Sequence, residues 1–430
     1  MIQPMKAKRE HICVFEHQTI VLKQKFEDGV VFDQNKLEAF VRFFGKGLPY
    51  YSLIRNGIQF NEYVGAVQIG NTLISVLPKA DKRQKEIQAE KKKWNQILID
   101  MLRAVHGFNV KAPSSSHLKI KNNSVLDLYF ELFVIETEYL LHRGLIKKYR
   151  KTEGNLNALK GSLQFSKQIS KNLAHKERFY SKHSTYDTEH LLHIILYKTL
   201  QVLKRINTNA ALVGRINALL LNFPEMPNQK ITESDLEKLE FNRKTMGYQK
   251  AIDFARLILL HYHPDLSKGR DDVLALMFDM NALWEQFVLV SLRKNKEFKV
   301  RGQASKFFWK PEGGSRRSIK PDIIVSTNNE NYVVDTKWKL VSNKPSIDDI
   351  RQMYVYHQYF EAKKVALLYP GDLPYVTGKF IDIKRQNKLS EFECGLLFTQ
   401  YIESVKCWQK RIGDKIKNWI NSSSGIESQE

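Results

Sequence analysis

One stretch of the 430-residue chain, Ser318–Lys339, limits the possible folds more than any other. Within it, Ile323–Val325 and Tyr332–Val334 are apolar runs dominated by β-branched residues, which is typical of strands. The residues between these runs, Ser-Thr-Asn-Asn-Glu-Asn, are turn formers. The pattern therefore predicts two strands joined as a β-hairpin.

Polar side chains occupy defined places on this hairpin. Asp322 precedes the first strand, and Asp335 and Lys337 stand at the end of the second. Because side chains alternate between the two faces of a strand, Asp335 and Lys337 share one face and Thr336 projects from the other. Two carboxylates and one ammonium group at a strand edge suit a hard divalent cation such as Mg²⁺. The lysine would orient or stabilise a hydroxide that attacks phosphorus.

The spacing of these residues resembles a known signature. Pro321-Asp322, then 12 residues, then Asp335-Thr336-Lys337 is similar to the PD-(D/E)xK motif of nucleases. Two acids and a lysine at loose spacing also occur by chance, and Pro264-Asp265 has the dipeptide without a following acidic-x-Lys strand. The alternative interpretation is that both aspartates flank turns and pair with surface lysines.

Composition narrows the class of protein. The net charge of +22 favours a polyanionic partner, because neutralising phosphates releases counterions; a basic proteome or an acidic protein partner is the alternative. No run approaches 18 apolar residues, and no signal-peptide pattern opens the chain, so we expect a cytoplasmic protein that spans no membrane. Three dispersed cysteines, Cys13, Cys394 and Cys407, argue against a disulfide framework or a cysteine zinc site.

The hydrophobic pattern predicts a multidomain mixture of α+β and α/β structure. Residues 1–112 form a β-rich N-terminal domain with a helix over Gln34–Phe44, a hairpin that turns at Gly70-Asn71, and apolar residues over Trp94–Val105 spaced for a helix face. Residues 113–268 form a mainly helical middle region that opens with a long helix over Val125–Tyr149. Within the first of these regions, the dense positive charge of Lys79–Lys93 fits either a surface that faces DNA or a partner, or a solvated helix.

Histidines offer a weaker metal hypothesis. His190 and His193 are three residues apart on an expected helix, and His261-x-His263 ends another. No further histidine, cysteine or acid stands at the spacing that would complete either set, so we expect surface or packing roles for them.

Residues 269–430 form the third expected domain. A helix over Asp271–Arg293 is followed by further strands, by the hairpin and, after it, by a helix and a buried strand. The expected helices and strands are Phe298–Gln303, Phe307–Lys310, Ile347–Phe360 and Lys364–Pro370, with a final amphipathic run over Leu397–Ile420. This order makes an αβββαβ core of the restriction-endonuclease type that the PD-(D/E)xK motif implies.

Five stretches, in the same order, resemble segments of the McrC family, the nuclease subunit of McrBC-type 5-methylcytosine restriction systems. They are Tyr63–Lys79 ("GxxQxG…I.ILPK"), Asn155–Phe165 ("NLxxLRGxLxF"), Asn172–Tyr180, Met280–Val288 ("MNxLFExFV") and Asp349–Tyr356 ("D.xQMxxY"). Lys160 stands where arginine is common and Trp284 where phenylalanine is common. The resemblance implies that Glu285 is a third carboxylate of the metal site and that Gln352 lies near it; a plain helix-surface role is the alternative for each.

The resemblance also implies a partner. McrC-type subunits cut double-stranded DNA in phage defence together with a separate AAA+ GTPase hexamer, McrB, into whose ring the N-terminal domain inserts and whose hydrolysis it stimulates. The sequence contains no Gly-x-x-x-x-Gly-Lys-[Ser/Thr] loop, so a nucleotide-driven motor has to come from another chain. Target recognition resides on the partner in such systems, which leaves the dependence on methylation open here.

We therefore predict a Mg²⁺-dependent DNA endonuclease subunit, with Mn²⁺ as an alternative ion. Asp322 and Asp335 would hold the metal, with Glu285 and the carbonyl of Thr336 in support, and Lys337 would act on the attacking water. Flexible glycines and paired arginines before the hairpin suit phosphate contacts, and the predicted DNA-binding residues are Arg316, Arg317, Lys320 and Lys339. Two rival hypotheses are a catalytically silent subunit that bridges the motor to DNA, and a stand-alone RecB-like nuclease.

Overall fold

A computed structural model describes the residues 10–26, 29–44, 49–69, 72–79, 88–105, 124–207, 209–229, 231–263, 273–339, 345–382 and 388–422. The chain divides into two compact units. The first contains Leu126–Leu276, and the second combines Glu10–Val125 with Met277–Glu430. The division into three domains that the sequence suggests stays a prediction. No helix among the described residues is long and apolar enough to cross a membrane.

Helices dominate the first unit. They are α3 (Val125–Arg143), α5 (Leu191–Ile206), α6 (Ala210–Asn222), α7 (Glu233–Glu237), the 3₁₀ helix η2 (Met246–Tyr248) and α8 (Gln249–His261). β10 (Tyr262–His263) then pairs in antiparallel fashion with the start of β11 (Val273–Asp279). His193 of α5 is buried, and its ring lies within hydrogen-bond distance of the Tyr248 hydroxyl (3.0 Å) and the Thr188 carbonyl (2.6 Å). The predicted packing role of this histidine is confirmed.

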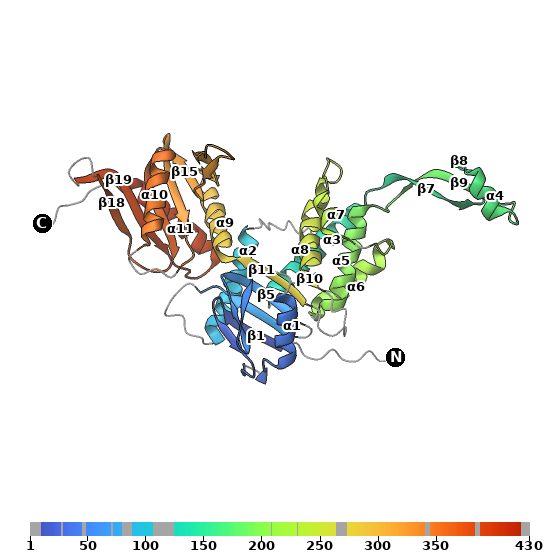
Figure 1. The fold of residues 1–430 in the computed structure, drawn as a ribbon, viewed down its shortest axis with the longest axis horizontal. Coiled ribbons are helices and arrows are strands. Elements are labelled where there is room, and N and C mark those ends of the chain that lie inside the picture. Colours follow the sequence, from blue (N-terminus) through green and yellow to red (C-terminus); the bar gives the residue numbers. More distant parts are fainter. Residues whose placement is uncertain are drawn as a thin grey trace. The chain divides into compact units, whose positions relative to one another are not determined.

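The helix expected over Val125–Tyr149 is shorter in the structure. It ends at Arg143 because Gly144 adopts a φ of 89°, the left-handed conformation that terminates helices. The chain then forms an antiparallel ribbon of β7 (Lys148–Leu156) and β9 (Phe179–Asp187), with β8 (Ser162–Leu163) and the helix α4 (Phe165–Asn172) at its far end. Figure 1 shows this ribbon extending beyond the helices of its own unit.

The second unit begins with two small sheets. In one, β1 (Glu10–Phe15) runs parallel to β6 (Thr72–Leu77), which pairs antiparallel with β5 (Tyr63–Ile69) as predicted, although the turn at Gly70-Asn71 lies outside the described residues. The other has the order β2 (Thr19–Val21), β4 (Gly57–Phe60), β3 (Tyr51–Ile54). The helix α1 has the predicted bounds Gln34–Phe44 and buries Phe40 against Tyr51, with ring centroids 4.9 Å apart. The helix α2 (Gln88–Val105) follows, while residues 80–87 of the basic stretch lie outside the described part.

A six-stranded sheet forms the rest of this unit. Its order is β12 (Lys299–Gly302), β15 (Ile323–Thr327), β16 (Glu330–Thr336), β17 (Ala362–Pro370), β19 (Lys388–Thr399), β18 (Val376–Asp382). The predicted hairpin is β15 and β16, and its turn residues Asn328 and Asn329 have φ angles of 51° and 63°, as a type I′ turn requires. The helix α10 (Ile347–Tyr359) packs on the sheet through Met353 and Tyr356.

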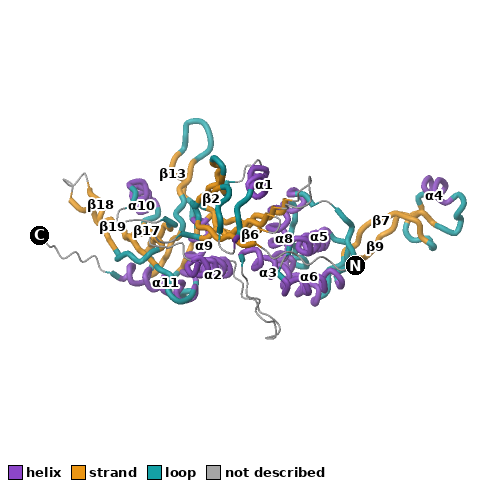
Figure 2. The backbone as a smooth tube through the Cα atoms, turned by 90° about the horizontal axis from the view of Figure 1, so that it is seen from below, coloured by secondary structure: helices purple, strands orange, loops and turns teal. Residues whose placement is uncertain are grey.

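Two other predicted helices are partly strand. The helix expected over Asp271–Arg293 is β11 followed by α9 (Met280–Arg293), and the side chain of Asp279 marks the boundary by accepting hydrogen bonds from the first turn of α9. The helix expected from Leu397 begins later: Thr399 ends β19, and Ser404 caps α11 (Val405–Asn421). The strand β18 was not predicted. A hairpin of β13 (Lys306–Trp309) and β14 (Arg317–Ile319) is inserted between β12 and β15 (Figure 2).

Candidate active site

The antiparallel register of β15 and β16 places two carboxylates opposite each other. Ile323 pairs with Val334, so the next position along the hairpin sets Asp322 beside Asp335. Asp335 is 1% exposed, whereas Asp322 is half-buried and its Oδ2 accepts hydrogen bonds from the backbone N (2.7 Å) and the hydroxyl (2.8 Å) of Thr336. Burial, together with the negative charge of Asp322, raises the pKa of Asp335 to about 6.

Lys337 lies next to this pair of acids. Its Nζ is 2.7 Å from Oδ2 of Asp335, which confirms that the two side chains share one face of the strand. Burial alone would lower the pKa of Lys337, but the neighbouring charges of Asp335 and Asp322 outweigh it and raise the pKa. The ammonium group is therefore charged at neutral pH.

A chain of hydrogen bonds from α10 holds Lys337 in place. Its Nζ donates to Oε1 of Gln352 at 3.2 Å, and Nε2 of Gln352 donates to the Tyr356 hydroxyl at 2.8 Å. The Tyr356 hydroxyl in turn donates to the carbonyl of Lys320 at 3.0 Å. The structure thus brings Gln352 to the site, as the sequence suggested, and links it to the segment just before Asp322.

Glu285 approaches the site from α9 and has a partner of its own. Its Oε1 accepts a hydrogen bond of 2.9 Å from Nε2 of Gln303. Burial raises the pKa of this carboxyl, the bond from Gln303 opposes the rise, and the charge of Asp322 adds to it. Gln303 has a φ of 53° and its backbone N donates to the carbonyl of Asp322, which ties β12 to the start of β15.

The donor set at the end of the hairpin fits a divalent cation. Burial is the main cause of the raised pKa of Asp335, and the negative charge of Asp322 adds to it; a cation would offset both effects. Mg²⁺ commonly takes only one or two protein carboxylates. Across the described ranges no group of three or more His, Cys, Asp and Glu side chains is placed so that it could hold a metal ion, and the supporting role of Glu285 at the metal site stays a prediction.

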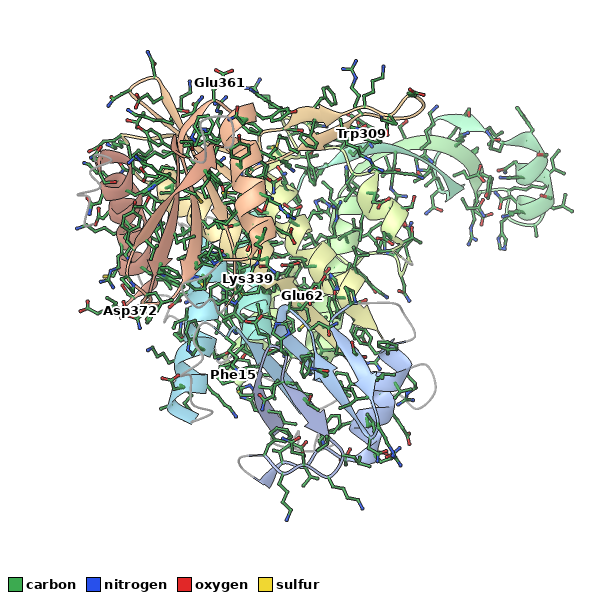
Figure 3. All side chains as sticks on the ribbon, turned by 60° about the vertical axis from the view of Figure 1, so that its left-hand side comes forward. Phe15, Glu62, Trp309, Lys339, Glu361 and Asp372 are labelled. Carbon is green, nitrogen blue, oxygen red and sulfur yellow. The ribbon has the colours of Figure 1, made fainter. Side chains whose placement is uncertain are left out.

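The predicted DNA-contacting residues are all exposed, but they differ in whether they already have a charged partner. Arg316, Arg317 and Lys320 are exposed on or beside the β13–β14 hairpin, which leads directly to Asp322. Lys339 is also exposed, but its Nζ lies 2.7 Å from Oδ2 of Asp349. Figure 3 shows it at the edge of the six-stranded sheet that lies toward Glu62. A phosphate contact by Lys339 would have to compete with this ion pair.

Comparison with known proteins assigns the family. Residues 58–370 match the family model described as "McrBC 5-methylcytosine restriction system component". This chain is a member of the McrC family. A search of curated proteins finds no match.

One solved structure shares the fold of this chain. A chain in the half-complex of a tetradecameric assembly of Thermococcus gammatolerans McrB AAA+ hexamers with bound McrC has 20% sequence identity and a TM-score of 0.67. The alignment covers 95% of this chain and 100% of that chain. A second chain, from the cryo-EM structure of the McrBC complex of the same organism, has 20% identity and a TM-score of 0.47 over 66% of this chain and 87% of that chain.

Three contacts of this McrC-family site were not found from the sequence. Tyr356 stands one helical turn beyond Gln352, and this i, i+4 spacing is a signal that could have identified it. Gln303 carries no recognisable signal. Glu16, which directly follows β1, accepts a 2.8 Å hydrogen bond from the indole of Trp338, the residue after Lys337, across 322 positions of sequence. Only the tertiary structure reveals such a contact.

Proposed function

We propose that this McrC-family chain is the Mg²⁺-dependent DNA endonuclease subunit of a restriction system. The observation that carries the proposal is the constellation of Asp322, Asp335 and Lys337, in which two facing carboxylates and a charged ammonium group meet at one sheet edge. The order α9, β12, β15, β16, α10, β17 supports it, because it is the αβββαβ order of the PD-(D/E)xK nuclease core.

In this proposal the acids hold the metal and the lysine acts on water. Asp322, Asp335 and the carbonyl of Thr336 would be the ligands, with Glu285 in an outer position, and Mn²⁺ is an alternative ion. The bound ion supplies positive charge that stabilises the negative charge developing on the phosphate. Lys337 orients the water that attacks phosphorus and stabilises it as it loses a proton. A P–O bond of the backbone then breaks, and the departing oxygen takes up a proton.

A separate motor is the second half of the proposed function. The fold matches that of a chain from a complex of McrC with McrB AAA+ hexamers, and this sequence has no nucleotide-binding loop of its own. We expect an McrB-like GTPase hexamer to be the partner, double-stranded DNA the substrate, and phage defence the role.

The test is cleavage of supercoiled plasmid in Mg²⁺ by the full-length protein, with and without the neighbouring GTPase and GTP. Asp335→Ala removes a proposed ligand. Asp348→Ala is the matched control, because it removes the same charge from a side chain that is 89% exposed and lies outside the site. Cutting that requires the partner, Mg²⁺ and Asp335, but not Asp348, supports the proposal. Stimulated GTP turnover without any cutting would favour the silent bridging subunit instead.

A further inference from the structure

The β13–β14 hairpin lies beside the proposed site but belongs to none of its contacts. It leaves the sheet after Gln303 and returns at Lys320, and Gln303 closes its base by donating to the carbonyl of Asp322 at 2.9 Å. Figure 2 shows the hairpin standing away from the six-stranded sheet. Ser318, the partner of Phe307, is four positions before Asp322 in the sequence, so the Cα atoms of Ser318 and Asp322 are at most about 13 Å apart. A DNA strand held at the proposed site would therefore lie close to this hairpin.

Three consecutive aromatic side chains on this hairpin face solvent. Phe307, Phe308 and Trp309 are 65%, 46% and 56% exposed, and Figure 3 shows Trp309 on the strand that leaves the sheet. The pairing with β14 is irregular between Phe307 and Trp309, which leaves the residue between them in a bulge. Large apolar side chains on a short exposed strand stabilise the fold little, so their exposure indicates a binding surface.

Anchors to α10 hold the hairpin in a defined position. Nζ of Lys306 donates to the carbonyl of Tyr359 at 2.6 Å, and the ring of Phe308 packs against that of Tyr359 at 5.3 Å. The guanidinium group of Arg316 lies 5.0 Å from the centre of the Phe307 ring. The exposed rings are therefore preorganised on a positioned element, which lowers the entropic cost of binding.

The positive charge around the rings indicates which class of ligand they bind. Between Ala304 and Lys320 there are five basic residues and one acidic residue, Glu312. Basic side chains beside exposed aromatic rings are the combination that binds single-stranded nucleic acid: the cations contact phosphates, and the rings stack on bases. A protein partner would meet the same rings, but it would have to be strongly acidic and would have to share the route by which DNA reaches Asp322.

We propose that Phe307 and Trp309 stack on bases of a locally unpaired DNA strand beside the scissile phosphate. This inference rests on the proposed nuclease function and narrows its substrate: the duplex is opened or distorted at the point of cutting, and the hairpin holds one strand open. Stacking tolerates any sequence because every base has a π face, so the hairpin contributes no base specificity. Phe308 anchors the hairpin and contacts the base weakly or not at all.

Equilibrium binding of the full-length protein to fluorescein-labelled DNA in EDTA, followed by anisotropy, tests the inference. The probes are one 24-mer sequence as perfect duplex, as duplex with a central bubble, and as single strand. We expect Phe307→Ala and Trp309→Ala each to weaken bubble and single-strand binding by about tenfold and duplex binding by less than about twofold. Ile381→Ala is the control, because this residue is 62% exposed on β18, at the opposite edge of the sheet.

A second readout reports on stacking itself. A 2-aminopurine placed in the bubble should be quenched by the wild-type protein and by Ile381→Ala, and markedly less by Trp309→Ala. Unchanged binding and quenching in both aromatic variants would overturn the inference. Equal losses of affinity for the bubble and for the duplex would also overturn it. So would aromatic variants that bind DNA normally but no longer bind the GTPase partner, because the hairpin would then be a protein-docking surface.

Asp335→Ala in the same assays separates this inference from the nuclease proposal. If both are right, this variant keeps the preference for the bubble and does not cut. If the wild type never cuts but the aromatic variants still lose bubble binding, the nuclease proposal fails and the stacking surface stands. If the wild type cuts and the aromatic variants bind the bubble normally, the nuclease proposal stands and the stacking inference fails.

Discussion

Lys337 is the residue whose surroundings explain the proposed chemistry most directly. It forms an ion pair with Asp335 and donates to Gln352, so both its charge and its direction are set by neighbours. We expect Lys337→Ala to lower the cleavage rate at least about 100-fold, because it removes a group that stabilises charge in the transition state. Gln352→Ala should cost less, about tenfold, since it removes only the positioning contact.

Single-turnover plasmid cleavage by Lys337→Ala, by Gln352→Ala and by the double variant measures this coupling. Because Gln352 is expected to act through Lys337, the double variant should be no slower than Lys337→Ala alone. Circular dichroism and partner binding should stay unchanged in all three. Additive losses would show that Gln352 acts on the DNA or the water independently of the lysine.

How much of the site the sequence predicts depends on how far apart the contacting residues lie along the chain. The pair formed by Asp335 and Lys337 follows from strand alternation, and its facing partner Asp322 follows from the two-strand hairpin. The contacts of Gln303 and Glu16 do not follow, because they depend on how distant elements pack.

At the scale of elements, a hydrogen bond joins the segment that follows β16 to the residue that follows β1. The indole of Trp338 donates to Oε1 of Glu16, and the backbone N of Lys79 donates to the same oxygen at 2.6 Å. Burial raises the pKa of Glu16 to about 7, against these two hydrogen bonds, which lower it. The carboxyl group therefore changes charge near neutral pH while it remains buried.

The pH dependence of stability follows from this raised pKa. Folded Glu16 binds a proton more tightly than the unfolded chain does, so its contribution to stability is highest below pH 4.5 and falls as the pH rises to about 7. The loss amounts to at most about 3 kcal/mol. Glu16→Gln keeps an oxygen acceptor for Trp338 and cannot ionise, so it should be the more stable protein above pH 7.

Thermal unfolding midpoints of wild type and Glu16→Gln between pH 5 and pH 8 check this expectation. The difference in midpoint between the two proteins should grow in favour of the variant as the pH rises. Comparing the two proteins at each pH cancels the contributions of other titrating groups. A constant difference across this range would show that Glu16 has the same pKa in the folded and unfolded protein.

The boundary between β11 and α9 provides a second prediction at this scale. Oδ1 of Asp279 accepts hydrogen bonds from the backbone N of Asn281 (2.8 Å) and of Ala282 (3.0 Å). Asp279→Ala should lower the free energy of unfolding by about 1 kcal/mol, because it leaves the first turn of α9 uncapped. Asp279→Asn retains the acceptor and should stay close to wild type in urea denaturation. Equal losses in both variants would mean that the negative charge, and not the cap, is what stabilises the helix.

Elements were predictable where a local signal agrees with the packing. Gln34–Phe44 and the β15–β16 hairpin have periodicity and turn residues that match their burial, and both have nearly the predicted bounds. The sequence predicts a helix over Val273–Met277 because this segment is apolar and continuous with the apolar run of α9, whereas the structure has it in the strand β11. A fully buried strand and a buried helix segment have the same apolar pattern, and the tertiary structure decides between them. The β7–β9 ribbon was missed because its exposed strands bury no continuous face.

At the scale of the whole molecule, the question is whether the net charge of +22 acts as a bulk property or through particular contacts. Both would strengthen binding to DNA, but they differ in how binding responds to salt. Each phosphate contacted by a cation contributes about −0.9 to the slope of log Kobs against log salt concentration, whereas a distant surface charge contributes little because salt screens it. The slope therefore counts contacts.

Two variants that lower the net charge equally distinguish these cases. Arg316→Ala/Arg317→Ala removes both arginines of the β13–β14 hairpin. Lys363→Ala/Lys417→Ala removes two cations that form ion pairs with Glu330 and Glu297 elsewhere on the second unit. We expect the arginine variant to reduce the magnitude of the slope for duplex DNA by about 2 and the lysine variant to leave it unchanged. The measurement is the affinity for duplex DNA, obtained by anisotropy from about 50 to about 300 mM KCl; this roughly sixfold change in salt concentration defines the slope.

Equal slopes in the two variants would mean that the hairpin arginines contact no phosphate and that the positive charge attracts DNA without a fixed path. A selective effect of Arg316 and Arg317 would instead place the DNA backbone along the hairpin that leads to Asp322. Arg316 also lies over the ring of Phe307, so Trp309→Ala is the aromatic variant that separates base stacking from phosphate contacts: it should affect unpaired DNA and not the salt slope. The excess charge of the chain would then guide DNA toward the open end of the β15–β16 hairpin, where the two carboxylates and Lys337 meet.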